Sequence, residues 1–476
     1  MTHSLFWYDY ETTGIVPSRD RPVQVAGIRT DLELNEIDTP VNLYCRLADD
    51  ILPHPAACLV TGIDPARLRD KGLTEAAFME RVQAELGQPG TCGAGYNSLR
   101  FDDEVTRYSL YRNFHDPYAR EWQGGNSRWD LIDLVRAAYA LRPEGIEWPR
   151  VDGQVSLRLE LLTAANNLEH GQAHDALSDV RATIALARLV RQRQPRLYEW
   201  MFEMRSKHRV IERIQMMKPM VHISGRFGAQ RNYLGVVLPL RWHPRNRNAL
   251  VVCDLTHDPR VLWEEAPEVL ARRLYTRHDQ LEEGQLPVPL KLIHVNRCPA
   301  IAPLTVLAKK DRERLQLDFS IYEHRVKNLV HAQDVWAQKL DHIYSSDEFA
   351  GNEDPEQQLY AGFIGERDRR LCQKVRDSSP EALASHTWMF EDPRLPELLF
   401  RYRARNYPNT LDTAEQAMWQ DFCRGRLTDP AYGAPHTLAS FEQALAQALV
   451  GANHDQRELL GQWQQYVNGL RLKLQI

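Results

Sequence analysis

Strand-like and helix-like stretches alternate over the first 194 residues, which restricts this part of the chain to an α/β fold. The predicted strands are 5–9, 23–30 and 41–47, and the predicted helices are 97–111, 127–139 and 176–193. The polar stretch 31–35 is turn-like, so the strands on either side of it are expected to pair as a hairpin. Gln194-Pro195 ends the last helix, and we expect the first domain, residues 1–194, to end there.

After residue 194 the predicted secondary structure changes twice along the chain. Residues 195–345 contain short apolar runs separated by Gly, Pro and Asn, which predicts a small β-rich domain or barrel with helical insertions. These runs are 220–223, 235–240, 249–255 and 288–295. The polar, acidic stretch 345–358 is typical of a linker. Apolar stripes at 438–449 and 459–470 then predict a helical C-terminal domain over residues 350–476.

Charge is unevenly distributed along the chain, whose net charge is −5. Residues 1–194 hold 21 Lys and Arg against 28 Asp and Glu, whereas residues 195–345 hold 24 against 17. Residues 346–476 are acidic again, with 14 against 19. A basic segment between two acidic ones predicts that the middle of the chain attracts a polyanion, and an ordinary solvated basic surface is the alternative.

Cysteine usage and hydropathy indicate the cellular compartment of the protein. The seven cysteines are scattered without C-x-x-C spacing, which favours a reducing cytoplasm and argues against a disulfide scaffold or a cysteine zinc site. No apolar run approaches the ~18 residues that span a bilayer. The N-terminal residues have neither the basic nor the apolar region of a secretory signal. A cytoplasmic protein without a membrane partner is expected.

Three groups of residues have the composition of a divalent-metal site. Asp9 and Glu11 are two positions apart in a predicted strand, so both side chains project to the same face. Asp102 begins a predicted helix, and Asp179 lies in the second turn of another, with His174 in the loop before it and Asp175 as the N-cap candidate. Hard cations such as Mg²⁺ and Mn²⁺ prefer carboxylate oxygens. Taken singly, each group also has an ordinary explanation as a solvated strand end, an acid in a first helical turn or a surface histidine.

The order of these three groups along the chain is more specific than any one group alone. D-x-E, then N-x-x-x-F-D, then H-x-x-x-x-D on an α/β segment resembles the three motifs of the DEDD exonuclease superfamily, in its DEDDh branch. Longer phrases resemble the bacterial exonuclease I family, among them DYETTG (9–14), YNSLRFDDEVTR (96–107), AHDALSDV (173–180), QMMKPMVHISGRFG (215–228) and YRARNYPNTLD (402–412). The resemblance implies an RNase H-like exonuclease domain, followed by an SH3-like β-barrel domain and a C-terminal helical domain around a groove for single-stranded DNA.

The resemblance also implies an activity, which is 3′→5′ hydrolysis of single-stranded DNA to 5′-mononucleotides in DNA repair and recombination. Asp9, Glu11, Asp102 and Asp179 are then expected to bind two Mg²⁺ ions, for which Mn²⁺ can substitute. His174 is expected to take the proton of the attacking water.

Substrate contacts are expected from stacking aromatic and cationic side chains. The candidates by resemblance, besides Glu11 and His174 at the reacting end, are Arg107, Tyr118, Trp122, Arg136 and Arg158. Packing at a domain edge is the alternative for Trp122, and an ion pair with Glu160 or Glu169 is the alternative for Arg158. Arg226 and Arg245 of the middle segment are equally well explained as plain surface charge.

Partners and rival functions follow from the same resemblance. Exonuclease I proteins bind the acidic C-terminal tail of single-strand DNA-binding protein, so this partner is expected here, with the enzyme itself a monomer. One rival is a DEDDh nuclease that acts on RNA or proofreads for a polymerase, and such enzymes often consist of the nuclease domain alone. Another is a non-catalytic DNA-binding protein on the same fold. The five motif residues and the matching phrases after residue 194 favour the single-strand exonuclease.

Overall fold

The structure is a computed structural model that describes residues 3–168, 175–276, 280–282, 285, 287–344 and 353–476. The chain divides into two compact units. The first consists of Met1–Ser127, Glu169–Ile184 and Ala350–Ile476, and the second of Arg128–Leu168 and Ala185–Phe349. The C-terminal segment therefore belongs to the same compact unit as the N-terminal sheet, although it follows the second unit in the sequence.

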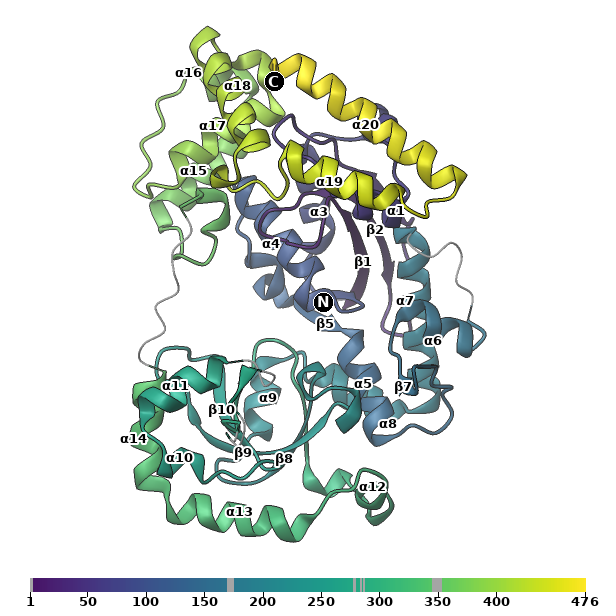
Figure 1. The fold of residues 1–476 in the computed structure, drawn as a ribbon, viewed down its shortest axis with the longest axis vertical. Helices are drawn as coiled ribbons and strands as arrows, with labels where there is room; N and C mark the ends of the chain where they lie inside the picture. Colours follow the sequence, from purple (N-terminus) through teal and green to yellow (C-terminus); the bar gives the residue numbers. More distant parts are fainter. Residues whose placement is uncertain (1–2, 169–174, 277–279, 283–284, 286, 345–352) are drawn as a thin grey trace. The chain divides into compact units, whose positions relative to one another are not determined.

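A mixed sheet in the strand order β3-β2-β1-β4-β5 forms the centre of the exonuclease-like part (Figure 1). Its strands are β1 (Ser4–Thr12), β2 (Pro22–Thr30), β3 (Val41–Tyr44), β4 (Thr91–Gly95) and β5 (Ser127–Asp130). β1 runs antiparallel to β2 and parallel to β4, and β2 pairs antiparallel with β3 as the predicted hairpin requires. β1 and β2 are buried almost throughout, and most of their residues are apolar.

The helices of the first unit's N-terminal part are α1 (Pro55–Thr61), α2 (Pro65–Lys71), α3 (Glu75–Leu86) and α4 (Asp102–Arg112), and α7 (Ala176–Arg193) begins in this unit. Phe78, Met79 and Val82 of α3 pack with Val105 of α4 against the aromatic side chains of β1. The predicted helix over 97–111 is a 3-10 turn over Ser98–Arg100 followed by α4. The predicted helix over 176–193 is confirmed in full.

The C-terminal helices are α15 (Glu366–Asp377), α16 (Pro380–Ser385), α17 (Leu395–Asn406), α18 (Thr413–Thr428), α19 (Leu438–Leu449) and α20 (His454–Leu474). α19 and α20, yellow in Figure 1, contact α1. Trp463 of α20 donates its indole N–H to the carbonyl oxygen of Ile63 at 3.1 Å, within a core that also holds Cys58 and Phe441. The apolar stripes predicted at 438–449 and 459–470 are the faces that make this contact.

A buried ion network joins the N-terminal and C-terminal parts of the first unit. Arg405 donates to the two Asp50 oxygens at 3.0 and 2.7 Å and also to Glu356. Arg21 donates to Glu356 at 2.6 Å, and the Arg426 Nε lies 3.4 Å from Asp50. Burial alone acts to raise the pKa of Glu356, but Arg21, Arg405 and the neighbouring arginines hold that pKa well below its usual value.

The second unit contains an antiparallel sheet in the order β11-β10-β9-β8-β12. Its strands are β8 (Met220–Ile223), β9 (Leu234–Trp242), β10 (Ala249–Asp254), β11 (Leu290–His294) and β12 (Ala300–Pro303). The four predicted apolar runs are strands β8 to β11, whereas β12 was missed because it is short and ends in proline. The core of this sheet includes Val237, Leu250 and Ile293.

The second unit also contains helices. They are α5 (Leu131–Leu141), α6 (Leu159–Ala165), α8 (Pro195–Glu203), α9 (Lys207–Arg213), α10 (Val261–Glu264), α11 (Pro267–Tyr275), α12 (Lys309–Arg314), α13 (Phe319–His331) and α14 (Gln333–Ile343). A small hairpin pairs β6 (Arg150–Val151) with β7 (Gln154–Val155). The prediction of a helix over 127–139 was wrong at its start, because residues 127–130 form β5 and Asp130 caps α5 by accepting from the Ile132 N–H at 3.0 Å. Among the described residues, no helix is long and apolar enough to cross a membrane.

Candidate active site

Three carboxylates of the first unit converge at the centre of its sheet. Asp9 and Glu11 come from β1, Asp179 comes from α7, and ligand oxygens of the three lie within 4.8 Å of one another. The period of two in an extended strand brings the first two to the same face. Asp175 accepts the Ser178 N–H at 3.1 Å, which confirms it as an N-cap, and Asp179 lies in the first turn of the helix instead of the predicted second.

Asp102, the first residue of α4, lies close to Asp9 and Tyr10 of β1. It is 3% exposed, and its Oδ1 accepts the backbone N–H of Tyr10 at 3.0 Å. Burial, and then the charge of Asp9, raise its pKa well above the usual value. Asp102 is thus electrostatically coupled to Asp9, although it is not one of the three residues whose oxygens share the 4.8 Å cluster.

The electrostatics of the cluster favour a cation. Burial, and then the charge of Asp179, raise the pKa of Asp9 to about 8. Burial, followed by the charges of Asp9 and Asp179, raises the pKa of Glu11 to about 9. Carboxylates this close repel one another unless positive charge lies between them. The donors are all oxygens, as hard divalent cations prefer, so these residues fit such an ion.

His174, the predicted general base, lies outside the described residues. It immediately precedes Asp175, whose backbone carbonyl accepts the Asp179 N–H at 3.0 Å. Its assignment therefore stays a prediction from the sequence.

Arg107, Tyr118 and Trp122 lie in one region of the first unit. Arg107 is 5% exposed and makes two hydrogen bonds to Glu121, at 2.6 and 2.9 Å. The Arg107 guanidinium carbon lies 5.5 Å from the centre of the Tyr118 ring. Trp122 follows the 3-10 turn over Ala119–Glu121 and is 67% exposed.

Arg136 and Arg158 belong to the second unit. Arg136 is 8% exposed, donates to Asp133 at 2.7 Å and lies 5.8 Å from the Tyr233 ring centre. Arg158 precedes α6 as its N-cap residue, and its exposed side chain donates to Glu160 at 2.6 Å. The ion pair with Glu160 considered for Arg158 therefore exists. Arg226 and Arg245 are both exposed on the same unit.

Two aromatic residues of the C-terminal segment extend the Tyr118 region and were missed in the sequence. Phe363 is 89% exposed, and its ring centre lies 5.8 Å from that of Tyr118. The Tyr360 hydroxyl accepts a hydrogen bond from Arg107 at 3.0 Å. The signal was the aromatic pair in Tyr360-Ala-Gly-Phe363, directly after a polar linker where a buried core is not expected.

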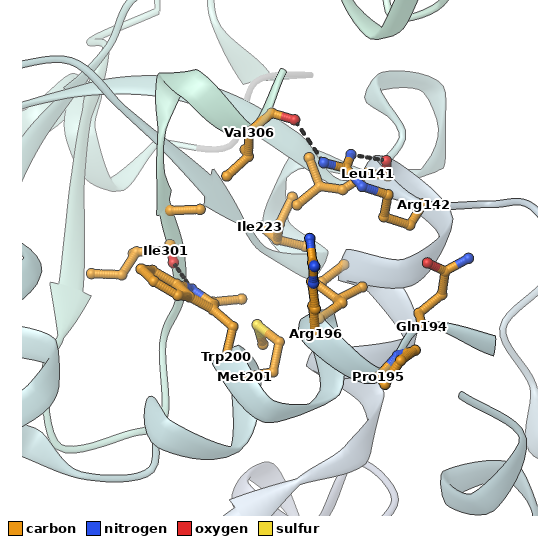
Figure 2. Close-up of a pocket in the computed structure, with 14 residues that line it drawn as sticks. Leu141, Arg142, Gln194, Pro195, Arg196, Trp200, Met201, Ile223, Ile301 and Val306 are labelled. Atoms are coloured by element: carbon orange, nitrogen blue, oxygen red, sulfur yellow. Dashed lines mark hydrogen bonds between the residues drawn. The ribbon is translucent and has the colours of Figure 1, made fainter. Parts of the chain in front are cut away.

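A cavity of about 400 Å³ lies within the second unit (Figure 2). Leu141, Met201 and Ile301 supply apolar walls, and Arg142 and Arg196 lie beside them. Trp200 is held across the cavity by its indole N–H, which donates to the Ile301 carbonyl at 2.9 Å. Arg142 is held similarly by the Val306 carbonyl at 3.0 Å. The cavity is therefore largely apolar, and it is lined by the guanidinium groups of Arg142 and Arg196.

Three domain families match successive parts of the chain. They are described as Exonuclease over residues 6–187, Exonuclease I SH3-like domain over 205–346 and Exonuclease I C-terminal domain over 353–470. Exodeoxyribonuclease I of Haemophilus influenzae is 44% identical over 98% of both chains. The chain belongs to the exodeoxyribonuclease I family. It is accordingly a hydrolytic nuclease, and the predicted order of exonuclease, SH3-like and helical domains is confirmed.

Solved structures of relatives match this chain over nearly its whole length. Exonuclease I of Escherichia coli in complex with a dA16 oligonucleotide has a TM-score of 0.94 at 43% identity, covering 98% of this chain and 100% of that one. Exonuclease I of Methylocaldum szegediense has a TM-score of 0.94 at 47% identity, covering 98% and 99%. A zinc-bound form of the Escherichia coli enzyme with single-stranded DNA has a TM-score of 0.93 at 43% identity, with 99% and 100% covered.

Proposed function

We propose that this enzyme degrades single-stranded DNA from the 3′ end to 5′-mononucleotides in a Mg²⁺-dependent reaction that serves DNA repair and recombination. The observation that carries the proposal is the cluster of Asp9, Glu11 and Asp179 in an exonuclease fold. The solved complexes of the Escherichia coli relative with single-stranded oligonucleotides support the choice of substrate. The match to the SH3-like and C-terminal domains favours this function over an RNA-trimming or proofreading nuclease.

Asp9, Glu11 and Asp179 would hold the divalent ions, two of which we expect, with Asp102 as the fourth ligand. When bound, such ions supply a nucleophile at neutral pH and stabilise charge on the leaving oxygen. The Tyr10 N–H fixes the orientation of Asp102, because it occupies one of the two carboxylate oxygens. We assign His174 as the group that takes the proton of the attacking water.

We further propose that the strand binds through aromatic and cationic side chains of the three domains, 1–194, 195–345 and 350–476. Trp122 offers a stacking surface, supported by Tyr118 and Arg107 in the same unit. Arg136 and Arg158 would add contacts from the second unit, whose basic middle segment attracts phosphates. We also propose that the enzyme is a monomer in the cytoplasm. The seven free, buried cysteines favour that compartment.

The cavity of the second unit is our proposed site for the acidic C-terminal tail of single-strand DNA-binding protein. Its apolar walls suit an apolar side chain, while Arg142 and Arg196 suit carboxylates (Figure 2). Arg196→Ala should weaken binding of a labelled tail peptide by roughly tenfold, the scale of one charge-assisted contact. Arg209→Ala, an exposed arginine paired with Glu212, is the matched control. Equal affinity of both variants would refute this site.

The activity is tested with a 5′-labelled single strand in Mg²⁺. The label should stay on shortening products and appear as mononucleotide only at the end. Asp179→Asn should abolish the ladder, whereas Asp70→Asn, an exposed aspartate paired with Arg69, should leave it unchanged. Early release of the label would show the opposite direction, and equal degradation of an RNA strand would favour the RNA nuclease.

A further inference from the structure

A short segment of the C-terminal part that includes Tyr360 contacts helix α4 of the first unit. The Tyr360 hydroxyl accepts from Arg107 at 3.0 Å and donates to Glu104, both on α4. The Tyr360 ring packs edge-on against Tyr108 of the same helix, with ring centres 6.0 Å apart. The segment is therefore fixed to α4 by a phenol that lies between a guanidinium and a carboxylate.

Arg107 is the centre of this arrangement, which we call the Arg107 cluster: Glu104, Arg107, Glu121 and Tyr360. Its side chain is 6% exposed and is enclosed by Glu104 at 2.7 Å and by two bonds to Glu121. Burial opposes the charge of Arg107, but the hydrogen bonds and charge of Glu121 raise its pKa above the usual value. Two carboxylates thus balance the cation, which leaves little positive charge for a phosphate.

The cluster supports two aromatic side chains that face solvent. Phe363 is three residues beyond Tyr360 and contacts the Tyr118 ring, and Tyr118 in turn lies against Arg107. Trp122 directly follows Glu121 in the sequence. Phe363 and Trp122 are 89% and 67% exposed, so both rings are accessible to a nucleotide base. Both are therefore attached to positions that the Arg107 cluster holds in place.

We propose that Tyr360 is a positioning residue, which through the Arg107 cluster holds Phe363 and Trp122 ready to stack on bases of the single strand. This inference rests on the proposed function. Stacking is productive only when the ring is already ordered, because ordering it during binding costs conformational entropy. On this view Arg107 orders the aromatic surface instead of contacting a phosphate.

The geometry also indicates which nucleotides are involved. Arg107 is five residues after Asp102 on α4, a separation of about 7.5 Å along the helix axis. Tyr360 contacts Glu104 and Arg107, two and five residues after Asp102, and Phe363 contacts Tyr118 beyond Arg107. The aromatic surface should therefore contact nucleotides upstream of the one being removed, and its effect should depend on strand length.

The test is the steady-state degradation of a trinucleotide and of an oligothymidylate of about twenty nucleotides, longer than a typical single-strand site. Tyr360→Phe should raise KM for the long strand about three- to tenfold and leave kcat unchanged, with no change for the trinucleotide. Phe363→Ala should raise KM for the long strand at least tenfold, and Phe363→Trp should restore it. Tyr432→Phe, on another exposed tyrosine of the C-terminal part whose ring contacts Phe422, is the matched control.

Each outcome of this test either supports or overturns the positioning role of Tyr360. A wild-type KM for Tyr360→Phe on the long strand would overturn the inference. So would an equal loss of kcat on both substrates together with a lower melting temperature, because that pattern indicates a structural role only. Glu121→Gln is the second variant, and it should reproduce the KM effect of Tyr360→Phe. If the wild-type enzyme degrades neither strand, the proposed function fails, and that failure is distinct from either result above.

Discussion

Glu356→Gln is the most informative single change for the architecture of the first unit. Glu356 is 2% exposed and accepts from Arg21 at 2.6 Å and from Arg405. Arg401 and Arg426 lie 3.6 and 3.7 Å away from the same carboxylate. Glutamine has nearly the same size, but it removes the charge and points an N–H₂ group at donors. Several buried guanidinium groups then lose the carboxylate that they share.

Breaking a buried ion pair by removing one partner costs about 3–5 kcal/mol of unfolding free energy. At about 2–4 °C per kcal/mol for a unit of this size, the melting temperature should fall by roughly 6–20 °C. The pH dependence gives a second signature. The pKa of Glu356 lies well below its usual value in the folded protein, so its contribution is present above the unfolded pKa of about 4.5 and is lost as pH falls through the folded pKa.

Calorimetric unfolding at several pH values measures both effects. The difference between wild type and Glu356→Gln should be constant from neutral pH down to about 5 and shrink below that. Glu397→Gln is the matched control, because Glu397 is also paired with Arg401 but its side chain is 53% exposed. Its effect should stay within about 1 kcal/mol, as for surface pairs. If both variants lose the same small amount, the network is not what holds the C-terminal helices to the sheet.

The remaining predictions concern the active site. Asp9→Asn should abolish cleavage in Mg²⁺ while circular dichroism and oligonucleotide binding stay near wild type, because it removes a ligand charge and keeps the size; normal turnover would contradict the metal assignment. Without metal, the free energy of unfolding should fall as pH rises from about 5 to 9, because the pKa values of Asp9 and Glu11 are raised to about 8 and about 9 and the folded form binds protons more tightly than the unfolded form. Thermal unfolding with and without Mg²⁺ should show that the ion stabilises most at high pH. A melting temperature that does not change with pH would argue against the cluster. His174→Ala should lower kcat by roughly 10²–10⁴, with partial recovery at alkaline pH measured in a pH–rate profile; rescue by excess Mg²⁺ instead would make it a metal ligand. Affinity for single strands, measured by fluorescence anisotropy, should fall as salt rises, since phosphate contacts release counterions.

The local sequence pattern predicted those parts of the carboxylate site whose geometry depends on a few neighbouring residues. The i, i+2 spacing of Asp9 and Glu11 placed both on one face of β1, and Asp175 as N-cap placed Asp179 where it meets them. These inferences held because strand period and helix capping are properties of a few consecutive residues. The short strands β5 and β12 were missed for a related reason, since each is too brief to show a period before the helix or turn that follows.

Which charged residues are buried together was decided only in the tertiary structure. The sequence predicted Arg107 as a cationic substrate contact. In the folded protein it is enclosed by Glu104, Glu121 and Tyr360, and Tyr360 lies 253 positions later in the sequence. Arg405 pairs with Asp50 across 355 positions in the same way. Residue type and local spacing determine which face a side chain takes, and so they determined the fold class and the carboxylate motifs. Whether a charge then meets water, a partner or a ligand depends on which distant segment covers that face, and no short-range pattern encodes that.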